Sequence, residues 1–368
     1  MRNCKVVISG GGTGGHIFPA IAIANAIKKK LPNAQILFVG AIGRMEMEKV
    51  PAAGYEIVGL NIAGFQRGSI AKNIGLPFKI VSSLWKARKI LKDFKADVAV
   101  GVGGYASGPL LKMASSMTIP TIIQEQNSFP GKTNILLSAK AEKICVAYDG
   151  MERFFPKEKI ILTGNPVRQE VVTNLEGKRP RGFEHFNLDG GKKTLLVIGG
   201  SLGAKTINQS IERNLSRFTE AGIQVIWQTG KSYFDQAVKA SESYREKGIR
   251  VYDFISKMDY AYAVADVVVS RAGAISVSEL CLAGKASILI PSPNVAEDHQ
   301  TKNALALVNH GAALLVKDNV SIDVLGDKVV NLFNDKVELE KLQINIQKMA
   351  YRDSAEIIAN EVLNLIKQ

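Results

Sequence analysis

Two glycine-rich loops, about half a chain apart, constrain the fold of this sequence more than any other feature. The first, residues 10–15, directly follows an apolar run at residues 6–8, and the second, residues 199–204, follows an apolar run at residues 195–198. Glycine lets a backbone approach a ligand closely, and a helix that begins after such a loop offers unpaired N–H groups to an anion. Two such units predict two half-domains of the nucleotide-binding type with a cleft between them.

The rest of the chain alternates short apolar runs with longer helical patterns. The runs that read as strands are residues 5–9, 35–40, 97–102, 119–123 and 143–147 in the first half, and 194–199, 223–228, 250–254, 265–270 and 286–291 in the second. Strands that alternate with helices in this way form parallel sheets covered on both faces. We therefore predict an α/β protein with two doubly wound parallel sheets.

A cluster of turn-forming residues at 163–166 marks the predicted domain boundary. The 368 residues are enough for two domains, at roughly 100–200 residues each. The predicted domains are residues 1–164 and 165–346. Residues 347–368 read as one amphipathic helix, which we place with the first domain although its pattern alone does not assign it.

The positive charge is concentrated in the first domain. Residues 1–164 hold 22 Lys and Arg against 10 Asp and Glu, a net +12 of the chain's +13. Such an asymmetry points to nucleic acid, an anionic membrane surface or an acidic substrate. The three scattered cysteines argue for a reducing compartment and against a disulfide framework or a zinc cluster. The apolar runs are too short for a membrane-spanning helix or a signal peptide.

Neither glycine loop completes a nucleotide-binding signature. The first has the spacing of the dinucleotide fingerprint, but the strand after it ends in Gly40 and Ala41, without the carboxylate that would hold a ribose. The second reads as a P-loop in which Ala204 replaces a required glycine, and no strand that ends in a metal-binding Asp follows. A nicotinamide-dependent oxidoreductase and an ATPase are therefore disfavoured. The simplest alternative is that these glycines only shape strand–helix turns.

Six separated motifs, in order along both halves, resemble one family. They are residues 10–20 (GGGTGGHIFPA), 124–127 (QEQN), 164–168 (GNPVR), 199–204 (GGSLGA), 271–279 (RAGAISVSE) and 298–304 (DHQTKNA). On these residues the chain resembles the MurG family, the N-acetylglucosaminyltransferases of bacterial peptidoglycan synthesis. It departs from the family pattern at His299, where some relatives carry Gln, and at Ala272, where relatives often carry Ser.

The resemblance implies a GT-B fold, in which two Rossmann-like domains face an interdomain cleft. It implies transfer of N-acetylglucosamine from UDP-N-acetylglucosamine to the C4 hydroxyl of the muramyl sugar of lipid I, which gives lipid II and UDP with inversion at the anomeric carbon. The first domain would bind the acceptor and associate with the membrane, and the second domain would bind the nucleotide sugar. No cofactor is implied, and the absence of an Asp-x-Asp motif agrees with stabilisation of the diphosphate by a helix dipole and an arginine rather than a metal ion.

A single in-line displacement needs a base for the acceptor hydroxyl. The resemblance implies that His16 is this base, and its place at the start of a predicted helix favours the neutral imidazole, because the helix end is positive. The alternative is a structural histidine that caps the helix. The resemblance further implies that Asn127 orients the base or the sugar, and that the acceptor lies against Gly103, Gly104 and Tyr105.

The same resemblance implies a set of UDP-N-acetylglucosamine contacts. They are Thr13, Gly14, Gly15, Asn127, Arg168, Ser201, Gly203, Ile255, Ala274, Ile275, Ser276, Glu279, Gln300 and Asn303. Within this set, the second glycine loop and Arg168 would hold the diphosphate, and Ile255 would contact the uracil. Gln300 and Asn303 would contact the hydroxyls of the sugar.

Glu279 has two interpretations. The resemblance implies that its carboxylate accepts hydrogen bonds from the ribose hydroxyls, a role that suits a carboxylate. However, Ser276-x-x-Glu279 also matches a capping box, in which the Glu side chain bonds back to a backbone N–H.

A basic segment with interleaved apolar residues, 67–95, carries the membrane prediction. It holds eight Lys and Arg against one Asp. Each basic residue near an anionic leaflet adds roughly 1 kcal/mol of binding free energy, and Phe78, Val81 and Trp85 are predicted to face the membrane. The alternative is an ordinary helix whose apolar stripe faces its own core. The resemblance implies a peripheral protein on the cytoplasmic side of the bacterial inner membrane.

Three classes of function are compared. The first is this transferase, with UDP-N-acetylglucosamine, lipid I, an anionic membrane surface and proteins of cell-wall synthesis and division as partners. The second is another sugar-nucleotide enzyme of the same fold, such as a UDP-N-acetylglucosamine epimerase, which would need additional carboxylates around the sugar, whereas residues 100–130 contain only Glu125. The third is a non-enzymatic protein that binds a membrane or nucleic acid. No RNA-binding signature or zinc finger supports nucleic acid binding, so we expect no nucleic acid partner.

Overall fold

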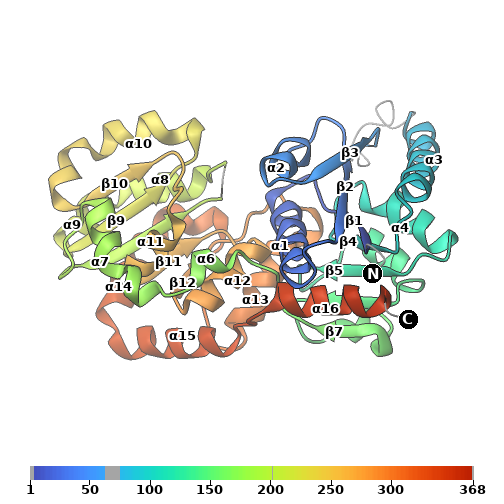
Figure 1. The fold of residues 1–368 in the computed structure, drawn as a ribbon. Coiled ribbons are helices and arrows are strands. Elements are labelled where there is room, and N and C mark those ends of the chain that lie inside the picture. The colour runs from blue at the N-terminus through green and yellow to red at the C-terminus, as the bar shows by residue number, and fades with distance from the viewer. Residues whose placement is uncertain (1–3, 63–74, 201, 367–368) are drawn as a thin grey trace. The chain divides into compact units, whose positions relative to one another are not determined.

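The computed structural model describes residues 4–62, 75–200 and 202–366, and the chain divides into two compact units (Figure 1). The first unit comprises Met1–Arg168 and Arg352–Gln368, and the second comprises Gln169–Tyr351. The predicted boundary after residue 164 lies a few residues before the observed one. Most of the helix predicted over 347–368 is present as α16 (Ser354–Ile366) in the first unit, whereas residues 347 and 348 end α15 (Lys336–Lys348) in the second unit.

The first unit is built on a seven-stranded parallel sheet in the order β3-β2-β1-β4-β5-β6-β7. Its strands are β1 (Lys5–Ser9), β2 (Gln35–Ala41), β3 (Glu56–Leu60), β4 (Val98–Gly101), β5 (Thr121–Glu125), β6 (Lys143–Val146) and β7 (Ile160–Leu162). Its helices are α1 (Gly14–Lys30), α2 (Glu46–Ala52), α3 (Leu76–Phe94), α4 (Ser107–Ser116), α5 (Lys132–Ser138) and α16. The strand order reverses between β1 and β4, and in such sheets ligands bind where the order reverses, outside the carboxyl ends of the strands.

The second unit repeats this plan with a six-stranded parallel sheet in the order β10-β9-β8-β11-β12-β13. Its strands are β8 (Lys193–Ile198), β9 (Ile223–Gln228), β10 (Ile249–Tyr252), β11 (Val267–Ser270), β12 (Ala286–Leu289) and β13 (Leu314–Leu315). Its helices are α6 (Gln169–Val172), α7 (Leu175–Phe186), α8 (Lys205–Arg213), α9 (Leu215–Glu220), α10 (Phe234–Ser241), α11 (Met258–Val264), α12 (Ala274–Ala283), α13 (His299–Val308), α14 (Ser321–Asn334) and α15. Here the order reverses between β8 and β11.

Each central strand is buried on both faces, because its alternate side chains enter two different cores. In the first unit, Val6 and Ile8 of β1 pack in a core with residues of α1 and α16, whereas Val7 packs with residues of α3 and α4. In the second, Leu195 of β8 packs with residues of α8, and Leu196 packs with residues of α12. This burial explains the continuous apolar runs that identified the strands, and the prediction of two doubly wound parallel sheets is confirmed.

Three strands were not predicted, and all three lie at sheet edges. They are β3, β7 and β13. The side chains of β7 and β13 are only half-buried, and those of β3 are buried at one end alone. Strand β3 begins with Glu56 and is interrupted by Gly59, and β7 and β13 contain only three and two residues, too few for the pattern to identify a strand.

Candidate active site

In the first unit, the loops that follow β1 and β4 lie against each other at the point where the strand order reverses. The N–H of Gly11 donates to the carbonyl oxygen of Gly103 at 3.3 Å. A Cβ atom on Gly104, whose φ is +90°, would lie 2.4 Å from the carbonyl oxygen of Gly11. The two loops can approach this closely only because Gly104 has no side chain.

His16 is held within this pair of loops. It is the third residue of α1, and its Nδ1 lies 3.0 Å from the carbonyl oxygen of Gly11 and 3.4 Å from Oγ1 of Thr13. A carbonyl oxygen only accepts, so Nδ1 carries the proton and Nε2 is the basic nitrogen of the neutral ring. Thr13, and not His16, occupies the N-cap position of α1.

Asn127 follows β5, and a buried carboxylate orients it. Glu125 is 2% exposed, and its Oε1 accepts from both the backbone N–H (3.0 Å) and the side-chain amide (3.2 Å) of Asn127. Its Oε2 accepts from the N–H of Gly131 and the amide of Asn134. Glu125 therefore fixes the turn that presents Asn127, a role that the sequence did not reveal because it depends on the path of the chain after the strand.

A second buried carboxylate, Glu46 at the start of α2, was also missed. It is 1% exposed and accepts hydrogen bonds from the backbone N–H groups of Ala41 and Gly12. Its neighbour Glu48 is exposed and pairs with Lys49. In the sequence the two glutamates look alike, and only the placement of α2 distinguishes them.

Other residues predicted for the first unit lie on its surface near these loops. Tyr105 is 47% exposed, and the guanidinium of Arg44 lies 5.7 Å from the centre of its ring. Arg168, the last residue of this part of the unit, lies over the ring of Phe18 on α1 at 5.3 Å. Arg44 was not predicted, and it brings a positive charge to the loop predicted to bind the acceptor.

In the second unit, the second glycine loop is packed against the loop after β9. A Cβ atom on Gly203, whose φ is +79°, would lie 1.9 Å from the carbonyl oxygen of Thr229. The loop leads into α8, whose N-cap residue Ala204 makes no side-chain cap. Among the described residues, the N-cap side chain therefore leaves the first N–H groups of α8 uncapped, and N–H groups at a helix start suit an anion. The predicted contact Ser201 lies outside the described residues.

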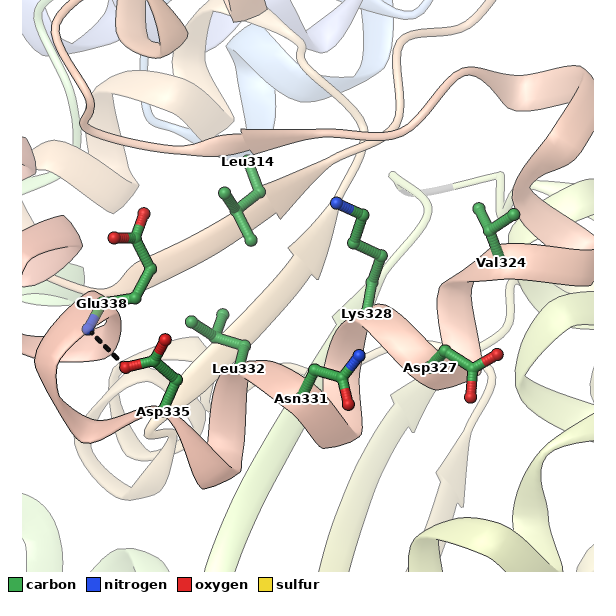
Figure 2. A pocket seen from close by; sticks show the side chains of 8 residues that line it. All are labelled: Leu314, Val324, Asp327, Lys328, Asn331, Leu332, Asp335 and Glu338. Carbon is green, nitrogen blue, oxygen red and sulfur yellow. Dashed lines mark hydrogen bonds between the residues drawn. The ribbon is translucent and has the colours of Figure 1, made fainter.

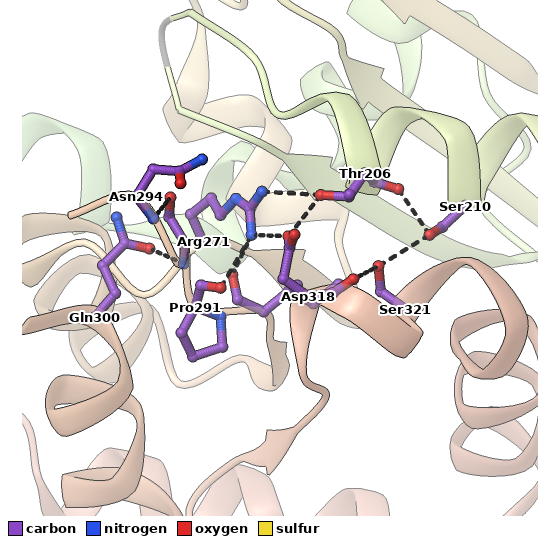
Figure 3. A network of polar contacts seen from close by, with 10 residues as sticks. Thr206, Ser210, Arg271, Pro291, Asn294, Gln300, Asp318 and Ser321 are labelled. Carbon is purple, nitrogen blue, oxygen red and sulfur yellow. Dashed lines mark hydrogen bonds and ion pairs between the residues drawn. The ribbon is translucent and has the colours of Figure 1, made fainter. Parts of the chain in front are cut away.

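Arg271, which follows β11, contacts residues that follow β12 and β13 in this unit (Figure 3). Its guanidinium pairs with Asp318 and donates to the carbonyl oxygens of Ile290 and Pro291, both at 3.1 Å, and to the hydroxyl of Thr206 at 3.0 Å. Thr206 belongs to the first turn of α8, and the two carbonyl groups follow β12. This network fixes the positions of these loops relative to one another.

Glu279 does not cap α12. The helix begins at Ala274 after the N-cap residue Gly273, which makes no side-chain cap, so Ser276 lies inside the helix and the capping-box interpretation is wrong. Glu279 is 7% exposed, and its Oε2 accepts from the hydroxyl of Tyr262 at 3.1 Å. Ala274, Ile275 and Ser276 form the half-buried first turn of α12.

The remaining predicted contacts of the second unit are partly engaged within the chain. Oε1 of Gln300, in the first turn of α13, accepts from the N–H of Ser292 (Figure 3). The amide of Asn303 is fully buried and donates to the carbonyl oxygen of Ala272. The N–H of Ile255 donates to the side chain of Gln228 at 2.9 Å, so uracil recognition there would rest on the carbonyl oxygen of Ile255.

A pocket of about 440 Å³ opens beside α14 and β13 (Figure 2). It is lined by Leu314, Val324, Asp327, Lys328, Asn331, Leu332, Asp335 and Glu338. Figure 2 shows the N–H of Glu338 donating to Asp335, which caps α15. None of the residues predicted to bind the nucleotide sugar lines this pocket, so it is not the predicted site.

The three cysteines supply no nucleophile. All are buried, and burial raises the pKa of the Cys145 and Cys281 thiols to about 12 and that of the Cys4 thiol to about 11. They therefore stay as neutral thiols at neutral pH.

Helix α3 has one buried face and one exposed apolar face. Ser83, Ala87 and Leu91 are buried. Phe78, Val81 and Trp85 are 79%, 54% and 74% exposed, and their spacing places them together on one side of the helix. The predicted residues thus do not face the unit's own core. Arg67 and Lys72 of the basic segment lie outside the described residues. Across the described ranges, no helix combines the length and the apolar character needed to cross a membrane.

Comparisons with known proteins cover nearly the whole chain and identify glycosyltransferases in both units. The glycosyltransferase family 28 N-terminal domain matches residues 6–146, and the glycosyltransferase family 28 C-terminal domain matches residues 194–358. The chain is 58% identical to the UDP-N-acetylglucosamine–N-acetylmuramyl-(pentapeptide) pyrophosphoryl-undecaprenol N-acetylglucosamine transferase of Phocaeicola vulgatus, over 99% of this chain and 97% of that protein. It is 54% identical to the protein of the same name from Parabacteroides distasonis, over 100% of this chain and 99% of that one. Among solved structures it is similar to Acinetobacter baumannii MurG, with a TM-score of 0.80 and 27% identity over 99% of this chain and 100% of that chain.

Proposed function

The chain belongs to glycosyltransferase family 28, and on that premise we propose that it transfers N-acetylglucosamine from UDP-N-acetylglucosamine to the C4 hydroxyl of the muramyl sugar of lipid I. The products are lipid II and UDP. The observation that carries this proposal is the similarity, over nearly the full length of both chains, to transferases named for this reaction. The epimerase considered above has no comparable support.

In the proposed reaction, the C4 hydroxyl oxygen of the acceptor attacks the anomeric carbon while the bond from that carbon to the diphosphate oxygen breaks. Nε2 of His16 accepts the hydroxyl proton, and UDP leaves with the bonding electron pair. The contact between Nδ1 and the carbonyl oxygen of Gly11 supports this role, because it leaves Nε2 as the basic nitrogen. Asn127, held by Glu125, would orient the base or the sugar.

The second unit would bind the nucleotide sugar. The N-terminal turns of α8 and α12, whose N-cap residues Ala204 and Gly273 make no side-chain cap, would donate N–H groups to the diphosphate as its charge develops. Glu279 would accept from the ribose hydroxyls, and Gln300 and Asn303 would contact the sugar. In the first unit, Gly103, Gly104 and Tyr105 would bind the acceptor. Arg44 beside Tyr105 would add a positive charge for its pyrophosphate.

We also propose that α3 brings the first unit to the membrane that contains the lipid-linked acceptor. The exposed Phe78, Val81 and Trp85 would enter the headgroup region, while Lys89 and Lys92, which continue the same face of the helix, would contact anionic lipids. The proposed location is the cytoplasmic side of the bacterial inner membrane. Contact with other proteins of cell-wall synthesis and division remains a prediction.

The test is a UDP-release assay with UDP-N-acetylglucosamine and a lipid I analogue. We expect release that depends on the acceptor and persists in the presence of a chelator. Replacement of His16 by Ala should lower kcat by about 10²–10⁴-fold, the usual contribution of a general base, and leave the Kd for UDP-N-acetylglucosamine nearly unchanged. Hydrolysis of the nucleotide sugar at the same rate with and without acceptor would contradict the proposed transfer. An equal loss of binding and turnover in the His16→Ala variant would make His16 a structural residue.

A further inference from the structure

The first glycine loop is closed around a carboxylate of its own chain. Oε2 of Glu46 accepts from the N–H of Gly12 at 2.8 Å, and Oε1 accepts from the N–H of Ala41 at 3.0 Å. A Cβ atom on Gly11 would lie 2.2 Å from Oε1, so the carboxylate fits only because Gly11 has no side chain. The carboxylate that is missing directly after β2 in the sequence is therefore supplied a few residues later, and it binds the loop instead of a ribose.

One peptide group connects this carboxylate to His16. The N–H of Gly12 and the carbonyl group of Gly11 belong to the same peptide group, and in a trans peptide they point in opposite directions. The N–H side donates to Glu46, and the carbonyl side accepts from Nδ1 of His16 at 3.0 Å. The hydrogen bonds thus run from the carboxylate through the Gly11–Gly12 peptide to the imidazole.

We propose that Glu46 is a positioning residue for His16, which acts through the Gly11–Gly12 peptide to hold the imidazole with its proton on Nδ1 and Nε2 ready to accept. This inference rests on the proposed role of His16 as the base. Hydrogen bonds in a chain polarise one another, so a negative charge at the N–H makes the carbonyl oxygen of the same peptide a stronger acceptor. The partner of one ring nitrogen decides which nitrogen carries the proton.

The chain contains a matched control. Glu48 is a carboxylate on the same helix as Glu46, but its side chain is 78% exposed. This control tests the loss of a negative charge from α2.

The first experiment is NMR spectroscopy of the full chain labelled with ¹⁵N-histidine. The chain has four histidines, and the signals of His16 are assigned by their loss in the His16→Gln variant. In Glu46→Gln, the new amide turns an NH₂ group toward one of the two backbone donors, so one hydrogen bond is lost. We expect the ¹⁵N shifts of His16 to move from the Nδ1–H form toward a mixture of tautomers. Glu48→Gln, which removes an exposed carboxylate from the same helix, should leave them unchanged.

The second experiment is steady-state kinetics. We expect Glu46→Gln to lower kcat by about 10- to 100-fold, the range found when a residue that orients a metal-binding histidine is removed, with an unchanged KM for UDP-N-acetylglucosamine. Glu48→Gln should change neither constant. A folded Glu46→Gln protein with the ¹⁵N shifts and kcat of the wild type would overturn the inference.

A second variant covers the case in which Glu46→Gln does not fold. Gly11→Ala keeps the carboxylate but displaces it from the loop, and it should change the His16 tautomer in the same way. An unchanged tautomer in this variant would overturn the inference. The two proposals fail differently: if His16→Ala retains full turnover while Glu46→Gln still alters the tautomer, the role of His16 as base is wrong and the positioning contact stands.

Discussion

Gly103 lies where any larger residue would displace His16. A Cβ atom at this position would be 2.6 Å from Cδ2 and 2.8 Å from Nε2 of the imidazole, and the φ of +99° is one that other residues rarely adopt. The loop after β4 thus forms one wall of the space around the proposed base. The short distance between the backbone of Gly103 and the ring of His16 thus limits where the imidazole can lie.

We therefore predict that Gly103→Ala lowers kcat strongly, because the methyl group must push the imidazole aside. The strained φ adds about 1–3 kcal/mol of destabilisation. Steady-state kinetics measures the loss of kcat, and thermal unfolding measures the loss of stability. Gly75→Ala, where a Cβ atom would meet no atom of the described residues within 4 Å, is the control and should change neither. A Gly103→Ala enzyme with the kcat of the wild type would show that His16 can move without cost.

For Glu279 we predict a change in affinity rather than in stability. Glu279→Gln should raise the Kd for UDP about tenfold, equivalent to about 1.4 kcal/mol, because the ribose hydroxyls lose a charged acceptor. The melting temperature should change little, since the helix begins at Ala274 and Glu279 does not cap it. Titration calorimetry measures the Kd for UDP, and thermal unfolding measures the melting temperature. Normal affinity with a large loss of stability would contradict the ribose contact.

At the scale of the element, α3 differs from an ordinary surface helix in having apolar side chains on the side opposite its buried face. Its buried residues are small or aliphatic, whereas its exposed residues include the two large aromatic side chains Phe78 and Trp85. A free surface of this kind marks an interaction site. The charge of the helix is basic, which favours an anionic membrane as the partner.

We predict that the double variant Phe78→Ser/Trp85→Ser loses at least tenfold in binding to vesicles that contain anionic lipid. Full burial of each of these two side chains contributes about 1.5–3 kcal/mol of binding free energy. Vesicle flotation measures the binding, and raised salt should weaken it further by screening the lysines. The control is Val337→Ser/Ile344→Ser on α15, which removes apolar side chains that are 77% and 55% exposed. Equal binding of the α3 variant and the wild type would reject the membrane face.

At the scale of the whole molecule, the chain leaves the first unit, builds the second and returns. Helix α16 packs on α1, and its Ile358, Ala359 and Val362 are fully buried in the core that also contains Val6 of β1. The first unit is therefore completed only by residues that follow the second unit in the sequence.

From this packing we predict that Ile358→Ala destabilises the first unit by about 2–5 kcal/mol, the usual cost of truncating a buried isoleucine. Hydrogen exchange should become faster in β1 and α1 and stay unchanged in β8 and α8. Ile357→Ala, at a neighbouring side chain that is 36% exposed, should have a much smaller effect. Equal acceleration in both units would mean that they unfold together.

Much of the fold could be predicted from sequence because buried parallel strands leave continuous apolar runs, as in β1 and β8. The edge strands β3, β7 and β13 are short and only partly buried, and the same pattern did not identify them. Among the candidate site residues, His16 lies in a recognisable motif. Glu46 and Glu125 were beyond prediction, because their roles depend on which backbone N–H groups the folded chain brings to them.

The return of the chain through α16 also bears on biosynthesis. Domains generally fold in the order in which they emerge from the ribosome. Here the unit that emerges first waits for a segment translated after the whole of the second, so its β1–α1 surface stays uncovered while the ribosome makes nearly two hundred further residues. A nascent chain stalled before Ser354 would expose that apolar surface, which makes it a substrate for chaperones.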